Sequence, residues 1–311
     1  MATSLTTTYA GELALPYFSN ALLQLNSLSN GTITVKQNIE GKAVVKTGAL
    51  TGALKGETCD WSDPSTITIN ERVLDPKAME LATQICKTDF LNDWEVERMG
   101  NSAWKSMGST GLVQWLIPQL LAGGMASLES MIHSGAAGAN AFDGFETLFR
   151  ADGTVVDVAT PIAIDASNVI GELGRVKAAM SVAIKTQPDA IINVSYNVGE
   201  AYIDALGGFG ASGLGSNGVQ ADGTMWFNGQ PLTFGGIKVV VSNGMSDNTM
   251  YGTYVENLWF GTNLLSDMTM VKTLDMEEND LSNNVRFKAK FHAGVQYGAG
   301  SEVVFYDGAA V

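Results

Sequence analysis

The sequence predicts an α+β protein, and three features carry the prediction. Runs of alternating β-branched and polar residues occupy 32–76, in TITVKQ, KAVVKT and STITINERVL, and are typical of half-exposed strands. A long stretch without charge keeps apolar residues at helical spacing and predicts a helix over about 110–134. An amphipathic helix at 167–184 precedes a short apolar run at 190–195, which indicates a buried strand.

Length and charge limit the possible functions. The chain has 311 residues, of which 45% are hydrophobic, enough for one large domain or two ordinary ones. Its net charge of −14 makes it a poor candidate for binding nucleic acid, because phosphate binding requires clustered Lys and Arg. Cys59 and Cys86 form no CxxC pair and indicate reduced thiols in a cytoplasmic protein. The N-terminal segment lacks the basic start of a signal peptide.

The first part of the chain has little core of its own. Residues 1–30 are predicted to form an arm whose apolar residues come in clumps, and an apolar arm must lie against something. Residues 32–76 are predicted to form a long two-stranded hairpin, punctuated by glycines, whose two faces both look fairly polar. Isolated hairpins are marginally stable in water, so we expect its tip to be mobile or to rest on a partner.

The middle of the chain is mainly helical. Residues 78–87 fit a strand or a helix, and the strand is favoured because it continues the preceding one. Residues 88–99 begin with a Thr cap and predict a short helix. The uncharged helix at 110–134 is expected to be kinked or restarted by Pro118 and ended by Gly135. It is long enough to span a bilayer, but its Gln and Gly residues and the lack of a flanking Lys/Arg cluster favour a buried helix, apolar on most sides.

The second half of the chain has a different rhythm. The apolar face of the helix at 167–184 consists of Val169, Ile170, Leu173, Val176 and Met180. A helix at 197–206 is expected to be capped by Asn197 and Glu200. An Asn-Gly pair at 228–229 predicts a hairpin turn. Further strands are expected in GIKVVVS, ENLWFGTNLLSD, MVKTLDM, NVRFKAKFHAGVQYG and SEVVFYD.

A glycine-rich stretch, GGFGASGLGSNG, occupies residues 207–218. Gly208, Gly210 and Gly213 fit the GxGxxG spacing that cradles a dinucleotide pyrophosphate. That fingerprint requires a strand before the glycines and a helix starting at them, whereas here a helix precedes and a turn-rich segment follows. The better interpretation is a loop at the end of a helix, long enough to be functional.

Other motifs of catalysis or metal binding are missing. The sequence contains no GxSxG, no HExxH and no P-loop, and Asp280 stands where a Ca²⁺ loop requires Gly. Glu129 and His133 lie one helical turn apart without an obvious third ligand, and we interpret them as a structural pair. The sequence therefore predicts no enzyme, no cofactor and no metal site.

The order of parts and the local sequence resemble the major capsid proteins of tailed bacteriophages, which have the HK97 fold. GELALPYFSNALLQLNSL resembles the opening of the N-terminal arm in that family. TITINERVLDPKAMELATQICKTDFLNDWE resembles the stretch that returns from its E-loop hairpin. ENLWFGTNLLSDMTMVKTLDM and NNVRFKAKFHAGVQYGAGSEVVFY resemble the end of such proteins. The resemblance covers nearly the whole chain, and its specificity comes from the combination and order of these stretches.

The resemblance implies a division of the chain and three groups of contact residues. The parts would be an N-arm at 1–31, an E-loop at 32–77, a P-domain at 78–154 with a spine helix at about 110–134, an A-domain at 155–281, and returning P-domain strands at 282–311. The E-loop residues in contact with neighbouring copies would be Lys36, Lys42, Lys46, Lys55 and Trp61. The N-arm contacts would be Leu13, Leu15, Tyr17 and Phe18. The loop at the capsomer axes would contain Gly208, Phe209, Gly210, Gly213 and Gly215.

The resemblance also implies a function. The chain would form homopentamers and homohexamers of an icosahedral shell around packaged double-stranded DNA, in a virion assembled in the host cytoplasm, without a membrane. Portal and scaffolding proteins, and decoration proteins, are the expected partners. The A-domain has 14 Asp and Glu against 5 Lys and Arg, a net charge of −9, and is expected to repel DNA. Two alternatives stay open: an encapsulin nanocompartment, against which the Ser/Thr-rich opening argues, and a tail-tube or surface protein, which would not need the long uncharged helix.

Overall fold

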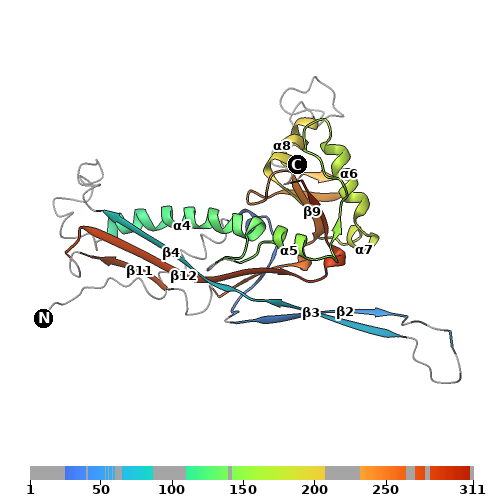
Figure 1. Cartoon of the computed structure of the whole chain (residues 1–311), viewed down its shortest axis with the longest axis horizontal. Coiled ribbons are helices and arrows are strands. Elements are labelled where there is room, and N and C mark those ends of the chain that lie inside the picture. The colour runs from blue at the N-terminus through green and yellow to red at the C-terminus, as the bar shows by residue number, and fades with distance from the viewer. Residues whose placement is uncertain are drawn as a thin grey trace.

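The chain forms two sheets, each with helices against it, and a hairpin that projects from them (Figure 1). The computed structural model describes residues 25–39, 41–52, 54, 56, 57, 59, 65–86, 110–138, 142–206, 232–263, 270–276 and 281–308. Helices and strands are both extensive, which confirms the α+β prediction. The helix predicted at 88–99 and the turn predicted at 228–229 lie outside the described residues.

The first sheet is built around one long strand, β12 (Asn284–Tyr297). On one side β12 pairs antiparallel with β4 (Lys77–Cys86), which settles that segment as a strand. On the other side it pairs antiparallel with β10 (Leu258–Thr262) and β11 (Met270–Asp275). β1 (Thr34–Lys36) pairs parallel with β10. The strand predicted in TITVKQ therefore exists, but it lies in this sheet and not in the hairpin.

The long helix α4 (Thr110–Ser134) packs on one face of this sheet. Successive residues of β12 alternate between buried and exposed over most of its length, and Phe287 and Phe291 share a core with Leu128 and Ile132 of the helix. The predicted end before Gly135 is confirmed, whereas Pro118 does not restart the helix, which is continuous.

In its described half, α4 is buried on one face only. Met125 and Leu128 are buried, whereas Ala122, Ala126 and Ser127 are exposed. The expected burial therefore holds for one face of this half, because only that face meets the sheet. Among the described residues, no helix has the length and apolarity needed to cross a membrane.

The second sheet has six strands in the order β5, β13, β9, β6, β8, β7. Their bounds are Val156–Asp157, Val304–Asp307, Thr249–Tyr254, Ala190–Val194, Ile237–Val241 and Thr233–Phe234. Every residue of β6 is buried, as the apolar run 190–195 predicts. Two helices, α6 (Val169–Ala179) and α8 (Tyr196–Ala205), share a core with this sheet through Leu173, Val198 and Ile192.

Two helices of this region differ in detail from the prediction. The segment 167–184 is not one helix: α6 ends before Met180, and α7 (Val182–Lys185) starts afresh with the Ser181 hydroxyl accepting from the Ile184 amide at 3.4 Å. Four of the five predicted face residues are buried, but Ile170 is 47% exposed. The residue before α8 is Ser195, so the expected Asn197–Glu200 cap is wrong.

Asn197 bonds to Ser195 and to the loop before β9. Its side chain accepts from the Ser195 hydroxyl at 2.7 Å and from the Asn248 amide at 3.0 Å, which ties the start of α8 to the loop before β9. A tight hairpin links β7 to β8 through Gly235 and Gly236, whose φ angles of +55° and +89° suit glycine.

The two sheets do not divide the chain at the boundaries expected from the sequence. β10 and β11 lie within 155–281 but pair in the five-stranded sheet. β13 lies within 282–311 but pairs with β9 and β5 in the six-stranded sheet. The last segment of the chain therefore crosses from one sheet to the other.

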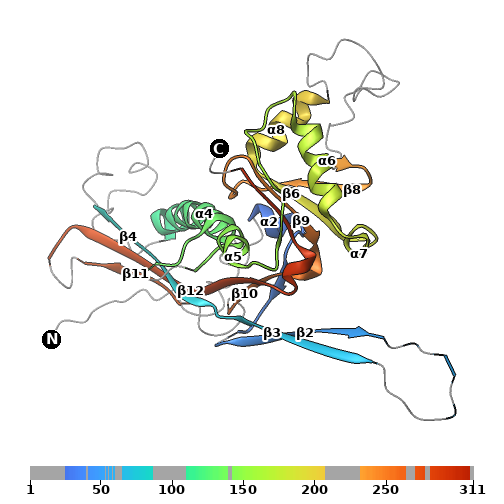
Figure 2. The same ribbon diagram turned by 45° about the vertical axis from the view of Figure 1, so that its right-hand side comes forward.

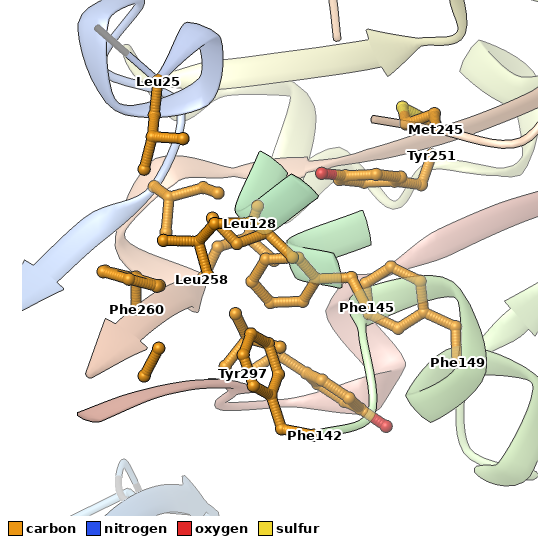
Figure 3. Close-up of a cluster of buried hydrophobic side chains, with 14 of the residues drawn as sticks. Leu25, Leu128, Phe142, Phe145, Phe149, Met245, Tyr251, Leu258, Phe260 and Tyr297 are labelled. Carbon is orange, nitrogen blue, oxygen red and sulfur yellow. The ribbon is translucent and has the colours of Figure 1, made fainter. Parts of the chain in front are cut away.

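One aromatic core joins the two sheets. Helix α5 (Phe145–Ala151) places Phe149 with its ring centroid 5.0 Å from that of Tyr297 in β12 and 5.3 Å from that of Tyr251 in β9 (Figure 3). Phe305 of β13 lies 5.7 Å from the same ring. Because strands of both sheets contact one side chain, the two sheets are held in a fixed relation.

The loop after β8 lies directly on α4. A Cβ added to Gly244 would lie 2.2 Å from the carbonyl oxygen of Glu129, and the Ser134 hydroxyl donates to the Gly244 carbonyl at 3.2 Å. Only a glycine allows this approach. Two short 3₁₀ turns, η2 (Val255–Asn257) and η3 (Gly300–Glu302), and the single helical turn α2 (Asn26–Ser29) complete the described elements.

Candidate interaction surfaces

A hairpin is formed by β2 (Ala43–Thr51) and β3 (Thr66–Leu74), which confirms the two strands predicted there. It projects from the body in both views (Figure 1, Figure 2). The described residues of β3 are exposed from Thr66 to Glu71, and only Leu74, at the root, is buried. As far as its residues are described, the hairpin therefore has no core of its own.

One face of the hairpin carries exposed apolar side chains on both sides of the Lys46–Glu71 ion pair, which lies on the same face. Opposed residues of an antiparallel pair share a face, and the register opposes Val44 to Val73 and Gly48 to Ile69. Val44, Val73, Ile67 and Ile69 are 52, 44, 68 and 62% exposed, and we call these four the apolar hairpin face. The expectation of two fairly polar faces therefore does not hold for this face: Ile67, Ile69 and Val73 alternate along β3, and the register places Val44 beside them.

Arg72 fixes the root of the hairpin to the body. Its Nε donates to the Gly298 carbonyl at 2.9 Å, its guanidinium pairs with Asp152, and its Cζ lies 4.2 Å from the ring centroid of Tyr297. The Tyr297 hydroxyl donates to the same carboxylate at 2.6 Å. Burial raises the pKa of Asp152, but hydrogen bonds from Tyr297, Thr154 and Arg72 outweigh it and hold the pKa well below its usual range.

The lysines expected on the hairpin lie in two places. Lys36 is exposed on β1, in the five-stranded sheet. Lys42 and Lys46 lie on the hairpin, with Nζ 3.7 Å from Asp75 and 3.0 Å from Glu71. Both lysine side chains are at least 65% exposed, so these ion pairs contribute little to stability.

Several residues named from the sequence lie outside the described residues. They are Leu13, Leu15, Tyr17, Phe18, Lys55, Trp61, Gly208, Phe209, Gly210, Gly213 and Gly215. The flanks of the glycine-rich stretch are described: α8 ends at Ala205 before it, and β7 begins at Thr233 after it. The expected order, a helix before the glycines, is confirmed, and it is the reverse of the dinucleotide fingerprint.

A buried polar cluster holds α2 to α4 and β9. The Ser27 hydroxyl donates to Glu129 and lies 2.7 Å from Nε2 of His133, and the Ser27 amide donates to Oε1 of Glu129 at 3.1 Å. Nδ1 of His133 lies 3.3 Å from the Tyr251 hydroxyl. All four side chains are at most 5% exposed. The structural interpretation of the Glu129–His133 pair is therefore confirmed, and Ser27 is the partner that the sequence could not reveal.

This cluster does not have the arrangement of a nucleophilic triad. In a triad the carboxylate orients the imidazole, which in turn activates an accessible hydroxyl. Here the carboxylate and the imidazole both contact Ser27, which is fully buried. Burial raises the pKa of Glu129, but the hydrogen bond and charge of His133 and the bonds from Ser27 outweigh it and lower the pKa. Among the described residues, no three His, Cys, Asp or Glu side chains are grouped to hold a metal ion.

Comparison with known proteins identifies the fold. No family model matches the chain, and no curated protein matches its sequence. The capsid of a native GTA particle aligns with 99% of this chain and 95% of that chain, at a TM-score of 0.60 and 14% identity. The chain has the HK97-like capsid fold.

Other solved structures have this fold at similar distance. A chain of the satellite phage P4 procapsid aligns with 94% of this chain and 98% of its own length, with a TM-score of 0.58 and 10% identity. A chain of the virus-like particle from Pyrococcus furiosus also aligns with 94% of this chain and 98% of its own length, with a TM-score of 0.53 and 10% identity. At these identities the likeness concerns the fold.

Proposed function

We propose that the chain is a shell protein whose copies self-assemble into the icosahedral capsid of a tailed bacteriophage. The observation that carries the proposal is the extent of the fold agreement: 99% of this chain aligns with 95% of a GTA capsid chain. An agreement of this extent includes both sheets and the projecting hairpin. We propose a structural role for the chain. The buried Ser27 cluster then serves to hold α2, α4 and β9 together.

The hairpin supports the proposal because its apolar face needs a cover. The side chains of Val44, Ile67 and Ile69 are more than half exposed. Burying apolar surface contributes roughly 25 cal/mol per Å², so covering this face favours association. The contacts of Arg72 aim the hairpin away from its own body, and a neighbouring copy is the surface that it would meet. The hairpin is then an arm between copies, the E-loop of the fold.

The proposal extends to the capsomers, the partner proteins and the content of the shell. Five and six copies would form the capsomers, with the glycine-rich stretch at their axes, and the N-terminal arm would contact neighbours. Portal, scaffolding and decoration proteins would complete the virion, assembled in the host cytoplasm. The shell would enclose double-stranded DNA without binding it specifically, because residues 155–281 carry 14 acidic and 5 basic side chains and repel phosphate.

A nanocompartment shell is the second candidate. The virus-like particle from Pyrococcus furiosus aligns with 94% of the chain at a TM-score of 0.53, so a shell of this fold need not come from a phage head. In that case the shell would be small and would enclose something other than packaged DNA.

Negative-stain electron microscopy of the purified full-length chain tests the proposal. Closed shells of phage-head size are expected, and small uniform shells would favour the nanocompartment. Tubes, or a protein that stays monomeric at high concentration, would contradict a shell function altogether.

A further inference from the structure

A pocket of about 320 Å³ lies between α2, α4 and the loop after β8. Its wall is apolar, formed by Leu25, Ala122, Met125 and Ala126, and it also contains the polar residues Asn26 and Glu129. Leu25 and Asn26 are the first two described residues of the chain. The preceding 24 residues therefore join the body at the edge of this pocket.

Glu129 gives the pocket a polar requirement. Its Oε1 accepts from both the amide and the hydroxyl of Ser27, whereas its Oε2 has no hydrogen-bond partner among the described residues. The side chain is 5% exposed, and a buried carboxylate oxygen without a donor destabilises the fold. Oε2 is closed to solvent, so an occupant with a hydroxyl or amide donor would relieve this cost once the Glu129 side chain turns toward the pocket.

The rim of the pocket on α4 is small and uncharged. Ala122 and Ala126, which line the pocket, are exposed there. The exposed face of a surface helix ordinarily carries charged side chains, and this chain has 32 Asp and Glu to place on its surface. A rim of small neutral residues instead allows another segment of backbone to approach closely.

We propose that the aromatic pair Tyr17 and Phe18, from the N-terminal arm of the same chain, fills this pocket. Aromatic rings pack well on a thioether such as that of Met125, and the Tyr17 hydroxyl supplies a donor for Glu129. Ser19 and Asn20 are turn-forming residues that let the arm reverse before Leu25.

Reach and charge also fit this occupant. Phe18 lies seven positions before Leu25, and an extended chain over seven steps spans up to about 25 Å. The first 24 residues contain Glu12 as their one charged side chain, so the apolar segment that follows it can be buried without stranding a charge. The inference does not depend on what the proposed shell encloses.

Disulfide trapping in the full-length chain tests the inference. In a background with Cys59→Ser and Cys86→Ser, Phe18→Cys is combined with Ala126→Cys, or with Ser127→Cys as the control on the next residue of the helix. We expect oxidation to close an intrachain disulfide at least about tenfold faster with Ala126→Cys than with Ser127→Cys. A tenfold ratio corresponds to a preference of about 1.4 kcal/mol for the docked position of Phe18. Equal rates at both positions would overturn the inference, and so would a product that is an interchain dimer, which would assign the pocket to a second copy's arm.

A test without cysteines uses chymotrypsin, which cuts after aromatic residues. Ala126→Leu fills the pocket and should expel the arm, so cleavage after Tyr17 and Phe18 should be about tenfold faster than in the wild type. Ser127→Leu, beside the pocket, should leave the cleavage rate unchanged. Equal cleavage in all three proteins would show that the arm is not docked there, whether or not the chain forms shells.

Discussion

Arg72 shows how one side chain sets the direction of a whole element. It bonds the carbonyl of Gly298, pairs with Asp152 and lies over the ring of Tyr297, so it contacts two separate parts of the body at once. Asp152 lies 80 residues from Arg72 and 145 from Tyr297 in the sequence. No local pattern could reveal this cluster, because each of its members looks like an ordinary surface residue in its own segment.

The lowered pKa of Asp152 gives the root of the hairpin a defined pH dependence. A carboxyl with a lowered folded-state pKa stabilises the fold above its unfolded pKa of about 4, and the contribution is lost as the pH falls toward the lowered value. Asp152→Asn should therefore reduce the free energy of unfolding by about 1–3 kcal/mol at pH 7, with a smaller difference from the wild type at pH 3. Urea unfolding of unassembled protein measures both values.

Asp204→Asn, at an exposed site, is the control for this prediction and should change little at either pH. If Asp152→Asn loses the same amount at pH 7 and pH 3, the carboxylate of Asp152 is not the source of the stabilisation.

Gly244 makes a second prediction at the scale of one residue. A Cβ there would lie 2.2 Å from the Glu129 carbonyl oxygen, so Gly244→Ala must push the loop away from α4. We expect a loss of about 1–3 kcal/mol in the free energy of unfolding. Gly123→Ala is the matched control: it lies in α4 with open space around its Cβ and should stabilise by about 0.5–1 kcal/mol. A tolerated Gly244→Ala would show that the loop and α4 are not in close contact.

At the scale of elements, sequence patterns predict the long helices and strands but not every break and cap within them. The strands in 258–262, 270–275 and 284–297 and the helix 110–134 follow from periodicity, which is a local property. The break of 167–184 at Ser181 does not, because a new helix start competes there with a continuous apolar face. The cap at Ser195 was missed because Asn197, the more obvious capping residue, bonds across to Asn248 instead.

Charges placed on the apolar hairpin face should block assembly without unfolding the monomer. Ile67→Lys together with Ile69→Lys should change the unfolding free energy of the monomer by no more than about 0.5 kcal/mol relative to the wild type. The reason is that both isoleucine side chains are more than 60% exposed. The same double-lysine variant should fail to form shells, since the charges of both new lysines would have to be buried between copies. Sedimentation separates shells from free protein.

Thr68→Lys together with Asn70→Lys places the same charges on the opposite face of β3 and serves as the control. It should assemble far better than the isoleucine variant. Shells of normal yield and stability from the isoleucine variant would mean that the apolar face is not a contact between copies.

At the scale of the whole molecule, two sheets form one body because a single aromatic core spans them. Phe149 contacts Tyr297 of one sheet and Tyr251 and Phe305 of the other. The chain crosses between the sheets again at its end, from β12 to β13. The family resemblance implied a boundary after residue 281. It did not reveal this crossing, since strand pairing depends on partners far apart in the chain. A rigid body with one projecting arm is suited to repeated contacts between identical copies.

Cryo-electron microscopy of the assembled full-length protein shows whether this chain builds a shell through its hairpin. We expect closed shells in which Val44, Ile67 and Ile69 of one copy are buried against a neighbour in every capsomer. A map of an assembly that leaves this face toward solvent would contradict the assigned contact. Particles that are tubes, or no particles at all, would contradict the shell itself.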